Sequence, residues 1–368
     1  MQASRFVFPV ESFDREFDSK LLLALHLLSS SKPTEILLGY DKHITELLPL
    51  IADPAVLLDK SCSDIMYSSR FVPVLKRNGR VTVSDEEGVN NISNNFDGLI
   101  TRFDPRASRD IHLYFTWGEL DRQLALKAGI SQDKVKISGN PRISLLSPEG
   151  RKYYQDYSDG IRSVFGEFYL VNENFCIETY NPTYQPPFRP YLSKQDMQLL
   201  HKNRKARRNA SALDRDQFMR LFLDIVNQHP ATPFVVRPHP MSDPVCWYNM
   251  FCKHRNVTII YQGPVEPWLY ACKSLISCGC TTALQAALIE VPVYHYSGSS
   301  KGYSNSLAAN VGTSLSNFNP ETINHGKVNL DLNYARSVMQ SAISPSQVIS
   351  DHLLNLSAQI SKSEVFTS

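Results

Sequence analysis

The sequence lacks the short motifs that mark several common classes of enzyme. It contains neither a G-x-x-x-x-G-K-[ST] phosphate loop nor a G-x-G-x-x-G fingerprint, so P-loop nucleotide hydrolysis and dinucleotide chemistry lose their main support. Its seven cysteines include no C-x-x-C pair, which disfavours a zinc ribbon and a thioredoxin-like site. We therefore expect reduced, mostly buried thiols, no metal site and no cofactor.

A strong charge imbalance and a long apolar run are also missing. The formal net charge is +2, whereas a dedicated nucleic-acid binder carries a large basic excess. The apolar cluster at residues 21–28 is too short to span a bilayer, and the acids that precede it argue against a signal peptide. These features predict a cytoplasmic protein whose only membrane contact is peripheral, at the inner membrane.

Strand and helix patterns alternate through most of the 368 residues. Such alternation is typical of parallel, doubly wound sheets. We expect an α/β protein with two Rossmann-like domains and a ligand-binding cleft between them. The predicted strands cover residues 5–10, 35–40, 55–59, 80–84, 113–116, 134–138, 167–172, 234–237, 257–260, 274–277 and 291–296.

The polar stretch at residues 147–162 is predicted to connect the two domains. Residues 1–150 would form the acceptor-side domain, and residues 165–340 the domain that binds a nucleotide-sugar donor. Residues 341–368 are expected to contain a helix that returns to the first domain. Ser344 would be its N-cap and Pro345 its first residue.

Three motifs follow predicted strands, and the first is Asp85-Glu86-Glu87-Gly88. Adjacent carboxylates raise one another's pKa, so one of them could act as a base near neutral pH. An acidic surface turn explains the same residues without any function, and the motif alone favours that explanation.

The second motif is Arg237-Pro238-His239-Pro240, which ends an apolar β-branched strand. A histidinium could neutralise or protonate a leaving phosphate, and the planar guanidinium of Arg237 matches phosphate geometry. The alternative is an ordinary turn in which Arg237 pairs with a local acid such as Asp243.

The third motif is the small, hydroxyl-bearing turn at Gly279, Cys280, Thr281 and Thr282, which leads into a helix. Its backbone N–H groups and hydroxyls could bind an anion. Simple N-capping by a threonine is the alternative. Each motif is weak by itself, whereas three of them at strand ends indicate a site.

Two further patterns favour structural explanations. The D-x-D spacing of Asp214 and Asp216 could hold a metal–diphosphate, but helix capping is the preferred interpretation. The basic run at residues 202–208 is typical of a solvated helix face. Its functional alternative is contact with an anionic acceptor or a membrane surface.

Several segments together carry a family resemblance, among them VSDEEGV, FYLVNENF, VVRPHP and VEPWLYACKSLISCGCTTALQAAL. Up to about residue 296 the chain resembles bacterial surface-carbohydrate biosynthesis proteins of the GT-B type. More distantly it resembles bacterial sialyltransferases and Kdo transferases, which use a D/E-D/E-G motif, an H-P motif and a paired Ser/Thr motif.

The resemblance implies a metal-independent glycosyltransferase with a CMP-activated donor. Glu86 would act on the acceptor hydroxyl, with Asp85 or Glu87 as alternative carboxylates. His239 would assist the departure of CMP. Thr281 and Thr282 would hold its phosphate.

The same resemblance implies the substrates. The donor would carry Kdo, sialic acid or another nonulosonic acid, and the acceptor would be a glycan or lipid-linked glycan of lipopolysaccharide or capsule. The N-P-R run that contains Asn140 and Arg142 also recurs with R-P-H-P in glycerophosphotransferases of teichoic-acid synthesis. These residues are expected on the donor side, and a CDP-glycerol donor is therefore the first alternative.

Two other classes also stay open. A nucleotide-sugar epimerase or hydrolase of similar fold would turn over its substrate without an acceptor. A non-catalytic partner would bind nucleotide or carbohydrate without turnover.

Overall fold

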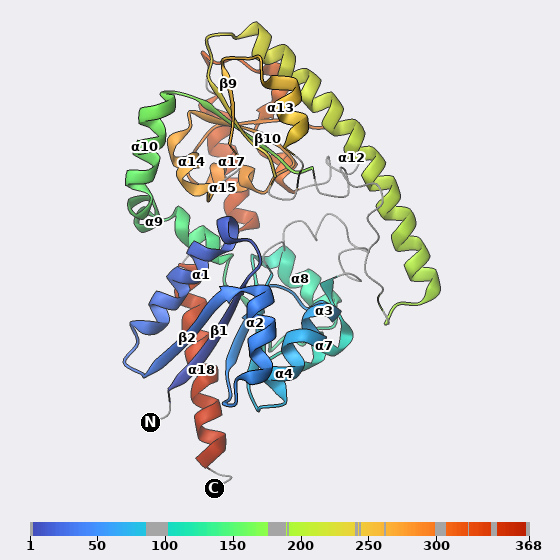
Figure 1. Cartoon of the computed structure of the whole chain (residues 1–368), viewed down its shortest axis with the longest axis vertical. Helices are drawn as coiled ribbons and strands as arrows, with labels where there is room; N and C mark the ends of the chain where they lie inside the picture. The colour runs from blue at the N-terminus through green and yellow to red at the C-terminus, as the bar shows by residue number, and fades with distance from the viewer. Residues whose placement is uncertain are drawn as a thin grey trace. The chain divides into compact units, whose positions relative to one another are not determined.

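The structure, a computed structural model, describes residues 3–85, 102–175, 189, 191–239, 242, 244–260, 263–298, 307–322, 324–339 and 344–365. The chain forms two compact units. One consists of Met1–Ser147 with Ser337–Ser368, and the other of Pro148–Arg336. Each unit contains a six-stranded sheet covered by helices (Figure 1).

The sheet of the first unit has the strand order β2-β1-β3-β4-β5-β6, and all of its pairs are parallel. Strands β3 and β5 are buried at every residue. Near-continuous apolar runs of this kind are typical of parallel strands that are covered on both faces. The strands are β1 (Ser4–Val10), β2 (Thr34–Tyr40), β3 (Val56–Asp59), β4 (Arg80–Ser84), β5 (Leu113–Thr116) and β6 (Val135–Ile137).

The helices of the first unit connect successive strands of its sheet, except for η3, which follows β6, and the C-terminal α18. They are α1 (Phe13–Leu28), α2 (Asp41–Leu47), η1 (Leu48–Leu50), α3 (Asp64–Met66), η2 (Tyr67–Phe71), α4 (Val72–Leu75), α7 (Pro105–Asp110), α8 (Glu119–Lys127), η3 (Pro141–Leu146) and α18 (Pro345–Val365).

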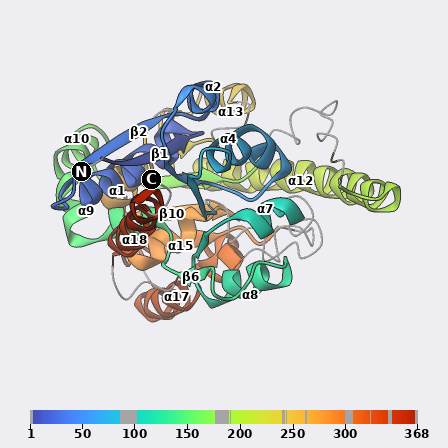
Figure 2. The ribbon, with the colours of Figure 1, turned by 90° about the horizontal axis from the view of Figure 1, so that it is seen from below.

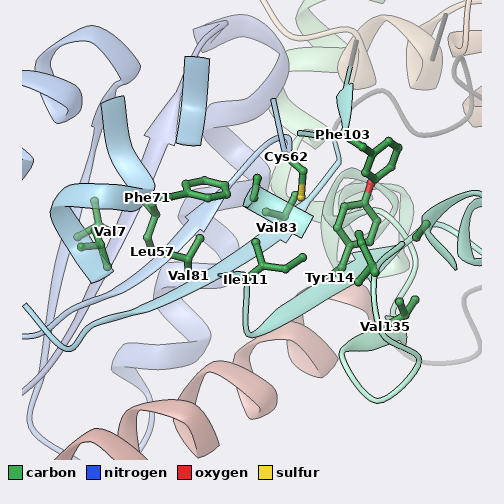
Figure 3. Packing of buried hydrophobic residues seen from close by; sticks show 14 of the residues in the cluster. Val7, Leu57, Cys62, Phe71, Val81, Val83, Phe103, Ile111, Tyr114 and Val135 are labelled. Carbon is green, nitrogen blue, oxygen red and sulfur yellow. The ribbon is translucent and has the colours of Figure 1, made fainter. Parts of the chain in front are cut away.

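Two apolar clusters cover the two faces of this sheet, because successive strand residues point to opposite sides. In β1, Val7 belongs to one cluster, whereas Phe6 and Phe8 belong to the other. Figure 3 shows the first cluster, in which strand side chains pack against Phe71 of η2 and Phe103.

Helix α18 begins directly after Ser344 and covers the second face together with α1 (Figures 1 and 2). Its Ile349 and Leu353 are fully buried against Leu23 of α1. The Ser350 hydroxyl donates a hydrogen bond to the Leu23 carbonyl at 3.4 Å. The last helix of the chain is therefore part of the first unit's core.

The sheet of the second unit has the order β12-β11-β10-β7-β8-β9, again with parallel pairs only. Strands β8 and β10, which lead into two of the predicted motifs, lie on either side of β7. The strands are β7 (Tyr169–Glu173), β8 (Phe234–Arg237), β9 (Val257–Ile259), β10 (Ser274–Cys278), β11 (Val293–His295) and β12 (Thr313–Ser314).

The helices of the second unit are α9 (Pro148–Tyr153), α10 (Gln155–Phe165), α12 (Lys194–Gln228), α13 (Val245–Phe251), α14 (Glu266–Ala271), α15 (Thr282–Leu288), η4 (Leu307–Asn310), η5 (Leu315–Asn317) and α17 (His325–Val338). One sheet face carries an aromatic core in which Phe218 and Phe222 of α12 pack against Trp247 of α13. No described helix combines the length and the apolarity needed to cross a membrane.

Two predicted segments are corrected by the structure. Residues 147–162, predicted to be a polar connection, form α9 and most of α10. The basic run lies within α12, which begins after Ser193, whose hydroxyl accepts the Asp196 N–H at 3.0 Å. The sequence had suggested that Asp214 and Asp216 cap the start of a helix. That prediction is wrong, because both residues lie inside this 35-residue helix.

Candidate functional site

The end of β7 joins two of the predicted motifs in the second unit. Because β7 lies between β8 and β10, its last residues can reach the chain that follows each neighbour. Glu173 accepts a hydrogen bond from the backbone N–H of His239, with 2.9 Å between N and Oε1. Asn174 donates one to the Gly279 carbonyl at 3.3 Å. The carboxyl end of the central strand thus holds both motifs together.

Glu173 is only 1% exposed, which is unusual because acidic side chains are mostly solvent-exposed. Besides His239, it accepts a hydrogen bond from the Phe175 N–H, and the Ser242 side chain lies within hydrogen-bonding reach of it. Burial raises the pKa of Glu173 to about 7, although these hydrogen bonds oppose the shift. None of the three predicted motifs contains Glu173, although it lies in the segment FYLVNENF, where it is the single acid at the end of a buried strand.

His239 is half-buried and lies in a tight turn after β8. Its carbonyl accepts hydrogen bonds from both the N–H and the hydroxyl of Ser242, each at 2.8 Å. The backbone on both sides of the imidazole is therefore fixed by Glu173 and Ser242. Such a fixed histidine can serve as an acid or as a charge partner for phosphate.

Arg237 has partners other than the predicted phosphate. Its guanidinium donates hydrogen bonds to the carbonyls of Gly263 and Pro264, and lies 5.4 Å from the centre of the Trp268 ring. These contacts favour a role in holding the segment before α14, and the phosphate contact stays a prediction. Asp243, the acid suggested as its alternative partner, lies outside the described residues.

The third motif forms a turn between β10 and α15. Gly279 has φ +65°, a left-handed conformation that other residues adopt only with strain. The Thr282 hydroxyl accepts a hydrogen bond from the Asn172 side-chain amide at 3.3 Å. Thr281 occupies the N-cap position of α15 without a side-chain capping bond, so the capping explanation does not account for its hydroxyl.

A buried polar row lies on the sheet face that bears Asn172. Asn172, Ser277 and His295 are register partners in β7, β10 and β11, and each is at most 5% exposed. Asn172 Oδ1, Ser277 Oγ and both His295 ring nitrogens have no hydrogen-bond partner within the described part of the chain. Burial lowers the pKa of His295 to about 4, so its imidazole is neutral at pH 7.

Asp85 of the acidic motif lies in the first unit, at the end of β4. It is 1% exposed, forms an ion pair with Arg102 and accepts a hydrogen bond from the Tyr114 hydroxyl at 3.4 Å. Its carbonyl accepts the Trp117 indole N–H. Asp85 is therefore buried and paired with a cation, and its role as an alternative catalytic carboxylate stays a prediction. Glu86 and Glu87 lie outside the described residues, and their catalytic role stays a prediction.

Asn140 and Arg142 also belong to the first unit, after β6. The Asn140 side chain accepts the Arg142 N–H at 2.8 Å and so caps η3. The Arg142 guanidinium lies 5.7 Å from the centre of the Trp117 ring. The structure therefore groups them with Asp85 around Trp117. Their predicted donor contact has no geometric support within this unit and stays a prediction.

Asp121 of α8 is a second buried carboxylate near Trp117. It is 1% exposed and accepts the Trp117 N–H at 2.9 Å. Burial, with a smaller contribution from the charge of Asp85, raises the pKa of Asp121 from 3.8 to about 7. In the unfolded chain this carboxyl loses its proton near pH 3.8, whereas in the folded protein it keeps the proton up to about pH 7. The group therefore lowers the stability of the folded state as pH rises from 3.8 to about 7.

Replacing Asp121 with asparagine should therefore remove part of the pH dependence of unfolding. The amide oxygen can still accept the Trp117 N–H, but it cannot ionise. Urea unfolding of both proteins across this pH range should show the variant gaining stability relative to wild type as pH rises, and levelling off above about 7. A difference that stayed constant with pH would contradict the assignment.

Across the described residues, no group of three His, Cys, Asp or Glu side chains is placed to hold a metal ion. In the second unit, the side chains that could take part in chemistry are an imidazole in a fixed turn, threonine hydroxyls and a buried carboxylate that joins the two motifs.

No protein-family model matches the sequence, and no curated protein does. Solved structures do resemble it. The UDP-GlcNAc 2-epimerase of Neisseria meningitidis bound to UDP-GlcNAc is 14% identical, with a TM-score of 0.57 over 96% of this chain and 100% of that chain. For S. aureus MnaA with UDP the identity is 12% and the TM-score 0.59, over 96% of this chain and 97% of that one.

A third similar structure is that of the wall teichoic acid polymerase TagF with CDPG. It is 10% identical, with a TM-score of 0.57 over 96% of this chain and 89% of that chain. At these identities the likeness concerns the fold. Together with the two parallel six-stranded sheets, it confirms the predicted fold class: the chain is an α/β protein with the two Rossmann-like domains of the GT-B architecture.

Proposed function

We propose that the protein is an enzyme that acts on a nucleotide-activated sugar or polyol. Its nucleotide phosphate would bind where β7, β8 and β10 end in the second unit. The observation that carries this proposal is a pair of hydrogen bonds at the end of β7. Glu173 binds the backbone N–H of His239, and the next residue, Asn174, binds the Gly279 carbonyl. Carboxyl ends of parallel strands are the usual ligand edge of open α/β sheets.

In this proposal His239 interacts with the phosphate that leaves. As a histidinium it would neutralise or protonate the leaving oxygen, while the Thr281 and Thr282 hydroxyls donate to the other phosphate oxygens. Thr282 can donate its O–H to the ligand while its oxygen still accepts the present hydrogen bond from Asn172. Stabilising charge that develops only in the transition state raises kcat.

We place nucleoside diphosphate substrates first, as a UDP-sugar or CDP-glycerol. Structures of the same fold contain UDP-GlcNAc, UDP and CDPG, which supports this class. The reaction would be epimerisation or hydrolysis of a UDP-sugar, or transfer of glycerol phosphate. All of these fit a role in surface-carbohydrate synthesis.

A second candidate is the transfer of Kdo, sialic acid or another nonulosonic acid from a CMP-activated donor to a surface glycan. The observation that favours it is the trio of motifs Glu86-Glu87-Gly88, His239-Pro240 and Thr281-Thr282. In that reaction Glu86 or Glu87 would take the proton of the acceptor hydroxyl.

One panel separates these possibilities. Purified protein is incubated with UDP-GlcNAc, CDP-glycerol, CMP-sialic acid and CMP-Kdo, each with and without a glycan or lipid-linked glycan acceptor. Chromatography measures the released UDP, CDP, CMP or glycerol phosphate, and NMR detects an epimerised sugar. Turnover without an acceptor indicates an epimerase or hydrolase, and acceptor-dependent release indicates a transferase. Nucleotide binding without turnover would indicate a binding partner, and no binding at all would overturn the proposal.

A further inference from the structure

Glu173 makes an unusual set of contacts for a buried carboxylate. Its two oxygens accept backbone N–H groups from two different segments, His239 after β8 and Phe175 directly after β7. The Ser242 side chain lies within hydrogen-bonding reach of the same carboxylate and closes the turn onto the His239 carbonyl. The residue therefore fixes the main chain that follows β7 and the main chain that follows β8, while it is itself almost inaccessible to solvent.

The residues on either side of Glu173 form hydrogen bonds with a different segment. Asn172, also in β7, and Asn174, directly after it, donate through their side-chain amides to Thr282 and to the Gly279 carbonyl, on the β10 side. Glu173 binds the His239 segment through the backbone N–H of His239. Glu173 thus binds the segment that contains His239, and the two asparagines bind the turn that contains Gly279 and Thr282.

We infer that Glu173 is a positioning residue that holds His239 in the orientation needed to act on the leaving phosphate. This inference rests on the proposed function, because it assigns His239 its role there. It adds a residue that lies outside the three predicted motifs. The carboxylate acts through the backbone of its partner and does not touch the substrate.

The protonation state of Glu173 offers a way to separate positioning from simple support of the fold. The charged and titratable groups around it are His239, Arg215 of α12 and Cys278 of β10. Its pKa lies at about 7, above the ordinary value of 4.5, because it is buried. The unfolded chain ionises first, so this group lowers the folded state's stability as pH rises between these values.

Positioning depends on pH in the opposite direction. The ionised carboxylate has acceptor capacity for both backbone N–H groups, whereas a proton on one oxygen weakens one of these bonds. Activity that depends on Glu173 should therefore rise as pH increases through about 7, while the stability contribution of the same group falls. If Glu173 merely supported the fold, the activity that depends on it would fall together with stability as pH rises.

The test compares Glu173→Gln with the matched control Glu167→Gln, which removes an 81% exposed carboxylate near the start of the same strand. A glutamine side chain offers one oxygen, so one of the two backbone N–H groups loses its acceptor. We expect kcat of the Glu173 variant to fall by about 100-fold, with KM little changed, since a small misplacement of a catalytic group has effects of this size. The acid limb of the pH–rate profile should disappear in this variant and persist in the control.

A second readout does not depend on activity. Amide hydrogen exchange should become faster at His239 in Glu173→Gln at pH 8, and stay unchanged in Glu167→Gln. Unchanged exchange, or a wild-type kcat with the acid limb intact, would overturn the inference. Faster exchange in a protein that turns over no nucleotide substrate would keep Glu173 as the anchor of the His239 turn, and it would refute the proposed function and the catalytic part of the inference.

Discussion

Replacing His239 with alanine is expected to lower kcat for the nucleotide substrate by about 100- to 10,000-fold, the range that general acid–base groups contribute. The imidazole would act on the leaving phosphate, so its loss removes an interaction that strengthens in the transition state. The backbone bonds of His239 to Glu173 and Ser242 do not involve the ring, and the turn should persist. Initial-rate kinetics with the substrate found in the panel would measure the effect.

His254→Ala is the matched control for this experiment. His254 is also half-buried and lies in the segment between α13 and β9. The centre of its ring is 5.9 Å from the centre of the Phe251 ring. Its replacement should leave kcat within about twofold of wild type, as for most substitutions that do not touch the reacting groups. If His239→Ala turned over as fast as this control, His239 would have no role in the chemistry.

The largest expected effect on stability comes from Arg70→Met in the first unit. Arg70 is 2% exposed, and its guanidinium forms two hydrogen bonds with the Asp59 carboxylate, at 2.6 and 2.8 Å. Without it, Asp59 stays as a buried charge near the end of β3. Removing one partner of such a pair costs about 3–5 kcal/mol of unfolding free energy. Urea denaturation at pH 7 would measure this loss.

Two comparisons identify the cause. Adding Asp59→Asn to Arg70→Met removes the isolated charge and should recover at least half of the lost stability, because an uncharged replacement avoids the desolvation cost. Arg122→Met breaks a partly exposed pair with Glu119 in the same unit and should cost only about 0–1 kcal/mol. A double variant as unstable as the single one would show that lost packing, not charge, explains the effect.

Several strands could be predicted closely from local sequence. The bounds of β4 and β5, Arg80–Ser84 and Leu113–Thr116, agree with the ranges expected from the sequence. Both strands are rich in β-branched and aromatic residues, which favour strands. The first turn of α18 was predictable for a similar reason, since Ser344 and Pro345 form a local start signal.

Helices with polar sequences could not be predicted in the same way. The first half of α12 is rich in charged residues, which hides the period of its few buried positions, and α10 lies in the stretch that was predicted to be a polar connection. In α10, Ile161 is buried, and Arg162 contacts the Tyr270 carbonyl in α14. Tertiary contacts of this kind decide such helices, and no window of local sequence contains them.

The sequence by itself determined that His239, Thr281 and Thr282 follow buried strands, because chain order and apolar patterns are local properties. Only the tertiary structure decided that Glu173 accepts a hydrogen bond from His239, 66 positions further along the chain, and that Asp85 is buried beside Arg102. A hydrogen bond depends on strand order and register, which bring β7 between β8 and β10. No spacing within the sequence carries that information, because a partner so distant along the chain becomes a neighbour only when the sheet forms.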